Sequence, residues 1–348
     1  MRTLVISDLH LGMRSGHDVL HRRAALDALL SVVREADRLV LLGDTVELYE
    51  APRLRALRAA RPVLEAIGAA APAGGIVLVP GNHDAALIRR WIRARRRERR
   101  PIGTAETVPG DGGPLLAFVV EALRPARVVV RYPGVWLAGG VWATHGHYVD
   151  RHLVTAVPRP LARGRLAPLP DRLLRPEDYE RARRLPIDPL RDAIHAVTPL
   201  ELRVAYGAVR RMGIGALPAI CAMPGVAAFP AVAAWGLDRE FRRAGLRAMA
   251  EVVCRLGIEA DHVVFGHLHR LGPRGDDDLA AWRPEPGGPR LWNTGTWVRE
   301  PGLLTGSEPP HPYWPGGAIW VEDGTPPRAV GLLDDVPLHA LRRHAPRY

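Results

Sequence analysis

Five short blocks of Asp, His, Asn and Gly punctuate this chain of 348 residues, and each follows a run of apolar residues. They are Ser7-Asp8-Leu9-His10, Gly43-Asp44-Thr45-Val46-Glu47, Gly81-Asn82-His83-Asp84, Thr144-His145-Gly146-His147 and Gly266-His267-Leu268-His269. The first three apolar runs alternate with segments of helical periodicity, which indicates a mainly parallel sheet buried on both faces. Because ligands bind at the carboxyl ends of strands in such sheets, we expect the blocks to converge on one site.

The hydrophobic pattern predicts the elements that carry these blocks. Helices are expected over 27–37, over 53–69 and over an arginine-rich segment at 89–100. Strands are expected at 3–7, 39–42, 76–79, 127–131, 140–144, 262–265, 290–293, 318–321 and 328–333. The apolar share of 47% allows a sizeable core and excludes a disordered chain.

The side chains in the blocks are those that bind divalent metals. An Asp-x-His or His-x-His sequence at the end of a strand places side chains i and i+2 on one face, where both can reach one ion. The glycines leave room for the backbone to turn where a Cβ would crowd the site. Carboxylate, imidazole and amide donors without a thiolate suit Mn²⁺ first, with Fe or Zn²⁺ as alternatives. Seven donors exceed the needs of one ion and suffice for two ions that share a bridging carboxylate.

The order D-x-H, G-D-x-x-[DE], G-N-H-[DE], H-G-H and G-H-x-H resembles the calcineurin-like metallophosphoesterase family. The segment Asn293-Thr294-Gly295-Thr296-Trp297 is similar to the strand that follows the last block in many members. The resemblance implies an α/β fold, a four-layer α-β-β-α sandwich of two mixed sheets. Because the blocks must meet at one site, we expect a single domain over 1–333, with a mainly helical insertion or cap at about 150–258 and a C-terminal tail over 334–348.

The same resemblance implies a role for each matched residue. Asp8, His10 and His269 would hold the first metal, and Asn82, His145 and His267 the second. Asp44 would bridge the two ions together with a hydroxide placed for in-line attack on phosphorus. His83 would protonate the leaving oxygen as a general acid. Asp84 would orient His83.

The expected function is therefore metal-dependent hydrolysis of a phosphoester. Glu47 stands where many members have Asp, and this variant is similar to the branch that contains UDP-diacylglucosamine pyrophosphohydrolases. A lipid-linked or nucleotide-sugar pyrophosphatase at the membrane surface is therefore one alternative. A nuclease and a non-catalytic scaffold are two others. The expected partner is a phosphorylated small molecule or a phospholipid-like substrate, and the sequence does not indicate an oligomeric state.

The formal charge of +11 would ordinarily indicate an anionic partner, but the composition weakens that inference. All 48 basic residues are Arg, a bias that codon usage explains equally well. Eight arginines fall within 89–100, and Arg89 and Arg90 are candidate substrate contacts there. His147 and Arg151 are further candidates because they closely follow a metal-ligand position. The arginines are not interleaved with aromatic residues suited to base stacking, so nucleic acid is a less favoured partner.

A stretch of 26 uncharged residues at 212–237 raises the question of membrane contact. Pro218, Pro224 and Pro230 would break a single spanning helix, and a single crossing would separate the last block from the others. A buried cap core and an exposed apolar flap that touches a membrane surface both remain open. With only two cysteines and no secretory signal before the first strand, the expected location is the cytoplasm, with peripheral membrane contact left open.

Overall fold

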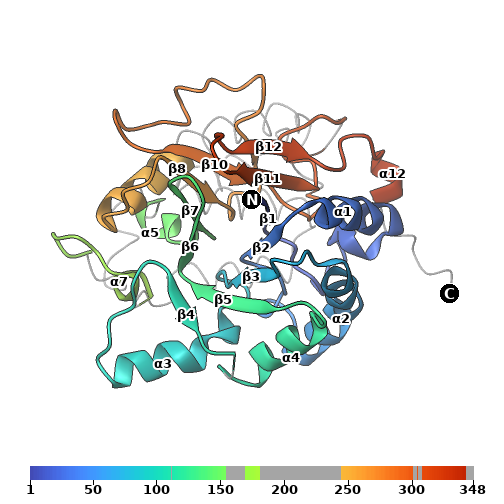
Figure 1. Cartoon of the computed structure of the whole chain (residues 1–348), viewed down its shortest axis with the longest axis horizontal. Helices are drawn as coiled ribbons and strands as arrows, with labels where there is room; N and C mark the ends of the chain where they lie inside the picture. Colours follow the sequence, from blue (N-terminus) through green and yellow to red (C-terminus); the bar gives the residue numbers. More distant parts are fainter. Residues whose placement is uncertain (111, 154–168, 181–243, 301–303, 305–307, 342–348) are drawn as a thin grey trace, which may run out of the picture.

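Two mixed β-sheets pack face to face at the centre of the molecule, and helices cover both outer faces (Figure 1). The computed structural model describes residues 1–110, 112–153, 169–180, 244–300, 304 and 308–341. This architecture confirms the predicted four-layer α/β sandwich.

The larger sheet has seven strands in the order β12-β11-β1-β2-β3-β5-β4. The strands β1, β2, β3 and β5 run parallel, whereas β11, β12 and β4 pair antiparallel with their neighbours. Their bounds are β1 Arg2–Ile6, β2 Arg38–Leu42, β3 Ile76–Val79, β4 Glu106–Val108, β5 Val128–Tyr132, β11 Gly317–Glu322 and β12 Arg328–Gly331.

The smaller sheet has five strands in the order β6-β7-β8-β10-β9. The strands β7, β8 and β10 are parallel, and β6 and β9 are antiparallel edges. Their bounds are β6 Gly134–Leu137, β7 Val141–Thr144, β8 His262–Phe265, β9 Leu271–Gly272 and β10 Arg290–Thr294.

Alternation along the strands explains why these runs are apolar at every position. In β1, Leu4 and Ile6 face the outer helices, while Val5 faces the other sheet. Val264 of β8 meets Val5 in the same inter-sheet cluster, whereas its neighbour Val263 packs under the helices on the far side. Strands buried on both faces require the continuous hydrophobic sequences from which they were predicted.

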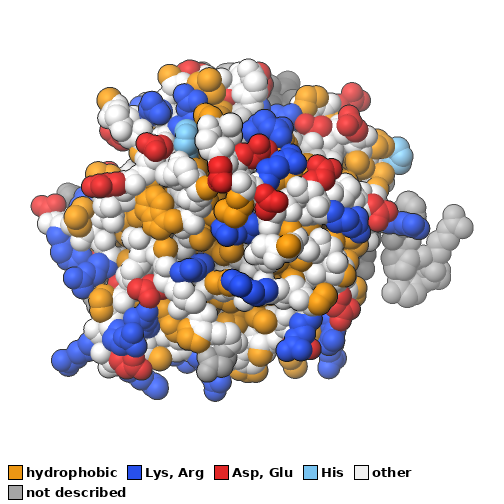
Figure 2. All heavy atoms as spheres, in the orientation of Figure 1, with side chains coloured by type: hydrophobic (Ala, Val, Ile, Leu, Met, Phe, Trp, Pro, Cys, Tyr) orange, Lys and Arg blue, Asp and Glu red, His pale blue; other side chains and the backbone are white. Residues whose placement is uncertain are grey.

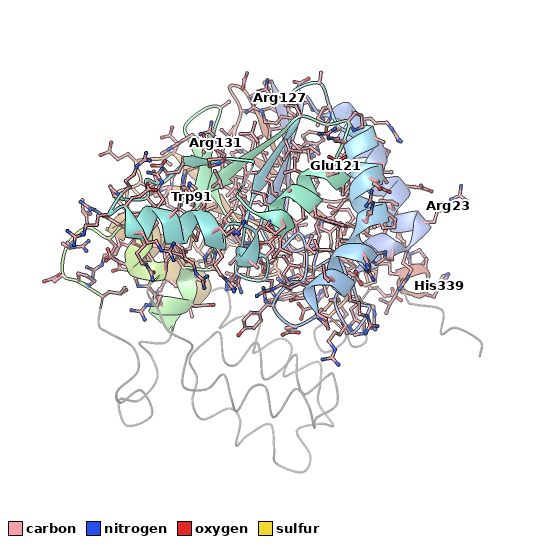
Figure 3. The ribbon with its side chains drawn as sticks, turned by 90° about the horizontal axis from the view of Figure 1, so that it is seen from below. Arg23, Trp91, Glu121, Arg127, Arg131 and His339 are labelled. Carbon is pink, nitrogen blue, oxygen red and sulfur yellow. The ribbon has the colours of Figure 1, made fainter. Side chains whose placement is uncertain are left out.

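Helices flank both sheets. Residues of α1, α2 and α4 pack on the larger sheet, and Figure 3, which labels Arg23, Glu121 and Trp91, shows these helices and α3 along one side of the molecule. A helix over residues 244–255, together with α5 and α7, covers the smaller sheet. The bounds are α1 Arg23–Glu35, α2 Arg53–Ala70, α3 Arg89–Arg97, α4 Pro114–Ala122, α5 Val149–Leu153, α7 Pro176–Glu180 and α12 Leu338–Leu341, with 3-10 turns at Val19–His21 and Ala85–Leu87.

One expectation about the C-terminal part of the chain changes. Residues 334–341 were expected to belong to a tail, but they include α12, whose Leu341 is buried in the core beside the larger sheet. Most of the expected insertion lies outside the described residues, as does the apolar segment 212–237. Its described parts contain α5, α7 and the helix over 244–255, and the mainly helical insertion as a whole stays a prediction. Among the described helices none is long and apolar enough to cross a membrane.

Candidate metal centre

All five blocks begin where a strand ends, and both sheets contribute to one site. The first three follow β1, β2 and β3 of the larger sheet, and the last two follow β7 and β8 of the smaller sheet. Face-to-face packing of the sheets brings these five loops together. The structure thus joins residues that are separated by more than 250 positions: the backbone N–H of His267 donates to Asp8 Oδ2 at 2.9 Å.

The ligand spacing was expected to reflect side chains on one face of a strand, but the backbone of the blocks shows a different cause. Asp8 and His10 do not lie on one face of a strand, because β1 ends at Ile6 and both residues have positive φ. Asp44, His267 and His269 also have positive φ. In the described part of the chain, the only other non-glycine residue of this kind is Arg99. Strained left-handed conformations cluster at functional sites, where they aim side chains at a ligand.

The first group of potential ligands consists of Asp8, His10 and His269. His269 Nδ1 must carry a proton because it bonds the Glu300 carboxylate, which leaves Nε2 aimed at Asp8 Oδ1, 3.1 Å away. His10 Nδ1 likewise donates to Glu47 Oε2 at 3.0 Å, and His10 Nε2 lies 3.9 Å from Asp8 Oδ1. Asp8 Oδ1 and His10 Nε2 are both buried without a hydrogen-bond partner among the described residues. Buried polar atoms need a partner, and a bound cation would supply one to both.

The second group consists of Asp44, His145 and His267, with Asn82 beside them. His145 Nδ1 donates to the carbonyl oxygen of Leu42 at 3.1 Å. Its Nε2 lies 3.1 Å from Asp44 Oδ2 and 3.1 Å from Asn82 Oδ1, two atoms that can only accept. His267 Nε2 lies 2.9 Å from Asp150 Oδ1, which makes Nδ1 its candidate ligand atom.

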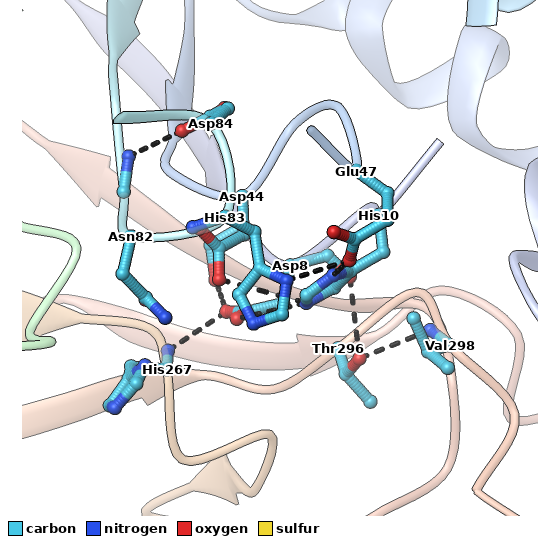
Figure 4. Close-up of polar contacts among 12 residues, drawn as sticks. Asp8, His10, Asp44, Glu47, Asn82, His83, Asp84, His267, Thr296 and Val298 are labelled. Carbon is cyan, nitrogen blue, oxygen red and sulfur yellow. Dashed lines mark hydrogen bonds and ion pairs between the residues drawn. The ribbon is translucent and has the colours of Figure 1, made fainter. Parts of the chain in front are cut away.

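Asp44 connects the two groups. Its Oδ2 lies 3.1 Å from His145 Nε2 in the second group and 3.7 Å from His10 Nε2 in the first. Figure 4 shows the side chains of Asp8, Asp44 and His10 turned toward a common centre. A metal-binding His characteristically donates its second nitrogen to a carboxylate or a carbonyl, as these imidazoles do. The donor set therefore fits two adjacent divalent ions, and the predicted ligands are the residues that the fold brings together.

Glu47 holds His83, a role that was expected of Asp84. Glu47 Oε2 accepts hydrogen bonds from Nδ1 of His83 at 2.7 Å and of His10 at 3.0 Å. Its Oε1 accepts the backbone N–H groups of Tyr49 at 3.0 Å and Glu50 at 2.8 Å. One buried carboxylate thus orients a candidate metal ligand and the candidate general acid together.

Asp84 has a different task, so the prediction that it orients the His83 ring is wrong. Its two carboxylate oxygens accept the backbone N–H groups of Thr45 at 2.8 Å and Gly81 at 2.6 Å. Asp84 therefore ties the second block to the third. Burial and the nearby Asp44 raise the pKa of Asp84 to about 6.

The charges of the site shift several pKa values. Burial alone would lower the pKa of His83, but the carboxylates of Glu47 and Asp44 raise it to about 10. Burial is opposed in the same way at His145, where Asp44 raises the pKa to about 9, and at His269, where Asp8 does so to about 9. Although burial disfavours its charge, Asp44 has a pKa well below the usual range because of His145 and His83. The carboxylates of the centre are therefore ionised at neutral pH.

Other residues that support the centre were not found from the sequence. Glu300 behind His269 and Asp150 behind His267 belong to none of the five blocks, and no pattern marks them. The segment Asn293-Thr294-Gly295-Thr296-Trp297 was recognised from the sequence, and the structure shows which blocks it contacts. Asn293 Nδ2 donates to the carbonyl oxygen of Gly266 at 2.7 Å, and the backbone N–H of Trp297 donates to that of Asp8 at 3.0 Å. This segment therefore clamps the first and last blocks together.

Glycine is required where a ligand packs against the backbone. A Cβ on Gly43, which has φ +89°, would lie 2.3 Å from the His145 ring. A Cβ on Gly266 would lie 2.6 Å from Asp8 Oδ2. This crowding agrees with the reason given for glycines in the blocks.

The candidate substrate contacts lie at different distances from the centre. The His147 ring lies beside the His145 ring, with 5.5 Å between centroids, and Arg151 is partly buried on α5. Arg89 and Arg90 are exposed at the start of α3, and no described contact joins either one to a candidate ligand. Substrate contact by these four residues stays a prediction.

Two mixed sheets that carry adjacent groups of Asp and His ligands at their strand ends define a class of metal-dependent hydrolases. A comparison with protein-family models matches residues 1–203, more than half of the chain, to the family "Calcineurin-like phosphoesterase". The chain belongs to this family and is a metallophosphoesterase. The match includes the first four blocks, and the fifth joins them in the structure. A search of curated proteins found no match.

Proposed function

We propose that this protein hydrolyses a phosphate ester with the help of two divalent metal ions, Mn²⁺ first among them. Asp8, His10 and His269 would hold one ion, and Asn82, His145 and His267 the other, with Asp44 between them. The observation that carries the proposal is the arrangement of His10, His145 and His269. Each fixes a proton on Nδ1 through an acceptor and aims Nε2 at the carboxylates of Asp8 or Asp44.

Bound ions would neutralise phosphoryl oxygens and lower the pKa of a bound water. The chain's own contribution to bond cleavage is assigned to His83. Because Glu47 and Asp44 raise the pKa of His83 to about 10, its imidazole carries both protons at neutral pH in the protein alone. With Nδ1–H held by Glu47, Nε2–H is the proton that His83 would give to the leaving oxygen. His83 would then regain a proton from solvent before the next turnover.

The substrate is less constrained than the reaction. Glu47 and the apolar segment 212–237 are the two features that favour a lipid-linked or nucleotide-sugar pyrophosphatase. The comparisons add no support for the UDP-diacylglucosamine branch. A nuclease rests on the arginines of 89–100 alone. A non-catalytic scaffold is the weakest alternative, because a complete set of ligands has no purpose in it. A phosphorylated small molecule is therefore the favoured substrate.

The test is metal-dependent turnover by the full chain. After chelation, we expect 4-nitrophenyl phosphate or bis(4-nitrophenyl) phosphate to be hydrolysed only when Mn²⁺ is restored. His83→Ala should lower kcat by about 10²–10⁴-fold, the usual contribution of a general acid. Asp44→Asn should abolish turnover because it removes the charge shared by both ligand groups.

Matched controls are exposed residues of the same types. Asp27→Asn on α1 and His339→Ala on α12 should leave turnover unchanged, since both side chains are exposed and no described contact joins either one to a block. If neither ester is hydrolysed with Mn²⁺, Fe²⁺ or Zn²⁺, the result would favour the non-catalytic scaffold. Undiminished activity of His83→Ala would remove the general-acid assignment while leaving the metal centre intact.

A further inference from the structure

An arginine-lined cavity lies between the end of α3 and the segment around α7. Its volume is about 220 Å³. Its lining includes six arginines from two segments that lie more than 70 positions apart: Arg95, Arg96, Arg99, Arg100, Arg172 and Arg175. Figure 2 shows basic side chains gathered at the lower left of the molecule, where Figure 1 places α3 and α7. A solvated helix face would not recruit arginines from a second segment, so codon bias alone does not explain this convergence.

Three of these arginines are already compensated by carboxylates. Arg172 forms a two-pronged ion pair with Asp178, at 2.9 and 3.0 Å. Arg95 pairs closely with Glu106, and Arg100 lies 3.6 Å from Glu98.

The other three arginines lack such a carboxylate. Within the described ranges, no ion pair involves Arg96, Arg99 or Arg175. Three carboxylates also line the cavity: Asp178 pairs with Arg172, whereas Glu177 and Glu180 accept hydrogen bonds from uncharged donors and keep their negative charge. The six arginines outnumber these three carboxylates together with Glu98 and Glu106, so the cavity has a surplus of positive charge.

The backbone conformation of Arg99 is a second observation that favours an anion-binding cavity. Arg99 has φ +54°, the left-handed conformation at which a helix usually ends on glycine. The N–H of Arg100 donates to the carbonyl oxygen of Arg95 at 2.9 Å and closes the end of α3 around this position. An arginine thus occupies a position that favours glycine, and its side chain lines the cavity.

Glu180 links the cavity to the candidate metal centre. It lines the cavity, and its Oε1 lies 3.8 Å from Nε2 of His147, whose ring lies beside that of the candidate ligand His145. Two side-chain contacts therefore separate the cavity from the second ligand group. Sites that enclose a whole drug-sized ligand have volumes of about 300–1,000 Å³, so this smaller cavity suits one part of a ligand.

We propose that this cavity binds a second phosphate group of the substrate, while the first is hydrolysed at the metal centre. Arginine matches phosphate with two parallel hydrogen bonds, and three uncompensated guanidinium groups suit a group with several negative oxygens. The inference rests on the proposed function and narrows its substrate to molecules that carry at least two phosphates. It adds Arg96, Arg99 and Arg175 to the candidate anion contacts Arg89 and Arg90.

The first test measures anion binding without metals, so that its outcome does not depend on catalysis. Inorganic tripolyphosphate is titrated into the chelated full chain by calorimetry. We expect binding by the wild type, and a Kd about tenfold weaker in Arg96→Ala and in Arg99→Gly, the loss expected for one charge-assisted hydrogen bond. Arg99→Gly is the sharper variant because it relieves the positive φ, so its Tm should not fall while binding weakens.

The matched control is Arg93→Ala, an exposed arginine of α3 outside the cavity lining. It removes the same charge from the same helix and should bind tripolyphosphate as the wild type does. An equal loss in Arg93→Ala and Arg99→Gly would mean that net charge alone attracts the anion and would overturn the proposal. Unchanged binding in Arg99→Gly would overturn it as well.

The second test distinguishes a phosphate of the substrate from a free phosphate ion. With Mn²⁺ restored, alkanediol bisphosphates of increasing length are compared with alkyl monophosphates of equal length. We expect Arg99→Gly to raise KM about tenfold for the best bisphosphate and to leave the monophosphate and 4-nitrophenyl phosphate unchanged. Equal KM values for both series in the wild type would show that the cavity binds only a free anion. Absence of all turnover would refute the proposed function, while the titration would still decide the cavity.

Discussion

Glu47 shows how one side chain sets the chemistry of two others. As a carboxylate it only accepts, so it fixes a proton on Nδ1 of both His10 and His83 and leaves their Nε2 atoms for a metal and for a leaving group. The Asp side chain that many members of the family have at this position is one methylene shorter than Glu47. The glutamate here reaches the two imidazoles while its other oxygen accepts two backbone N–H groups.

Glu47→Gln should separate these tasks. If the amide oxygen accepts the N–H groups of Tyr49 and Glu50, the amide NH₂ must face the imidazoles and force the proton of His10 onto Nε2. We therefore expect Mn²⁺ affinity to fall by about 10–100-fold, as for other residues that support a metal ligand, and kcat to fall with it. Calorimetric Mn²⁺ titration and steady-state kinetics measure the two effects.

Glu47→Asp is the control for this substitution, since it keeps an acceptor-only carboxylate. It should retain more Mn²⁺ affinity than Glu47→Gln. Wild-type affinity in Glu47→Gln would show that the proton position on His10 does not matter for metal binding.

At the scale of elements, the loops after the strands, rather than the strands themselves, set the directions of the candidate ligands. Gly43 follows the end of β2 with a positive φ and lets the second block pass close to the His145 ring. The strands fix where the loops begin, and the left-handed residues aim the ligands.

Gly43→Ala and Gly139→Ala form a matched pair that isolates this close approach. Both glycines have positive φ, +89° and +66°, but only Gly43 has a neighbour, His145, whose ring a Cβ would meet at 2.3 Å. Each alanine should cost about 1–2 kcal/mol of unfolding free energy for its backbone conformation. Gly43→Ala should in addition displace His145 and weaken Mn²⁺ binding. Denaturant unfolding and Mn²⁺ titration separate the effects, and equal Mn²⁺ affinity in the two variants would contradict the account.

The sequence predicts the buried elements well because both faces of each strand are constrained. All nine expected strands appear within about two residues of their predicted positions. The missed strands β4, β6 and β9 all lie at sheet edges, and β4 and β6 include exposed positions, so they lack the continuous apolar run that marks the central strands. The missed helix α4 starts at Pro114 after several glycines and follows no block.

The same limit applies to the candidate site. Asp8, Asp44 and the histidines are predictable because metals need those side chains at ordered positions. The positive φ values of Asp8, His10, Asp44, His267 and His269 are not, since Asp and His adopt that conformation more often than most residues but do not require it. The pairings of Glu300 with His269 and Asp150 with His267 are long-range contacts that depend on how the sheets pack.

At the scale of the whole molecule, the centre sits where the two sheets meet, so protons and metals affect overall stability. The carboxylates of Asp44 and Asp8 raise the pKa of His145 and His269 from 6.5 to about 9. In the metal-free protein, the stability from these charge pairs is fully present below pH 6.5 and is lost as the pH rises through about 9. Metal binding needs the unprotonated nitrogens and should therefore strengthen over the same range.

Proton release tests this linkage. Calorimetric titration of the chelated protein with Mn²⁺ at pH 7, in two buffers of different ionisation enthalpy, should show at least one proton released per chain. Apparent affinity should fall as the pH is lowered from 8 to 6. Binding heats that are equal in both buffers would contradict the protonated state of the two histidines.

The most direct test of the central claim is the number of metal ions that the full chain holds. After loading with Mn²⁺ and removal of free metal, mass spectrometry of the metal content should find two ions per wild-type chain. It should find one in His269→Ala, which loses a ligand of the first group alone. One ion per wild-type chain with full phosphoesterase activity, or two ions undiminished in His269→Ala, would contradict a centre built from two adjacent ligand groups.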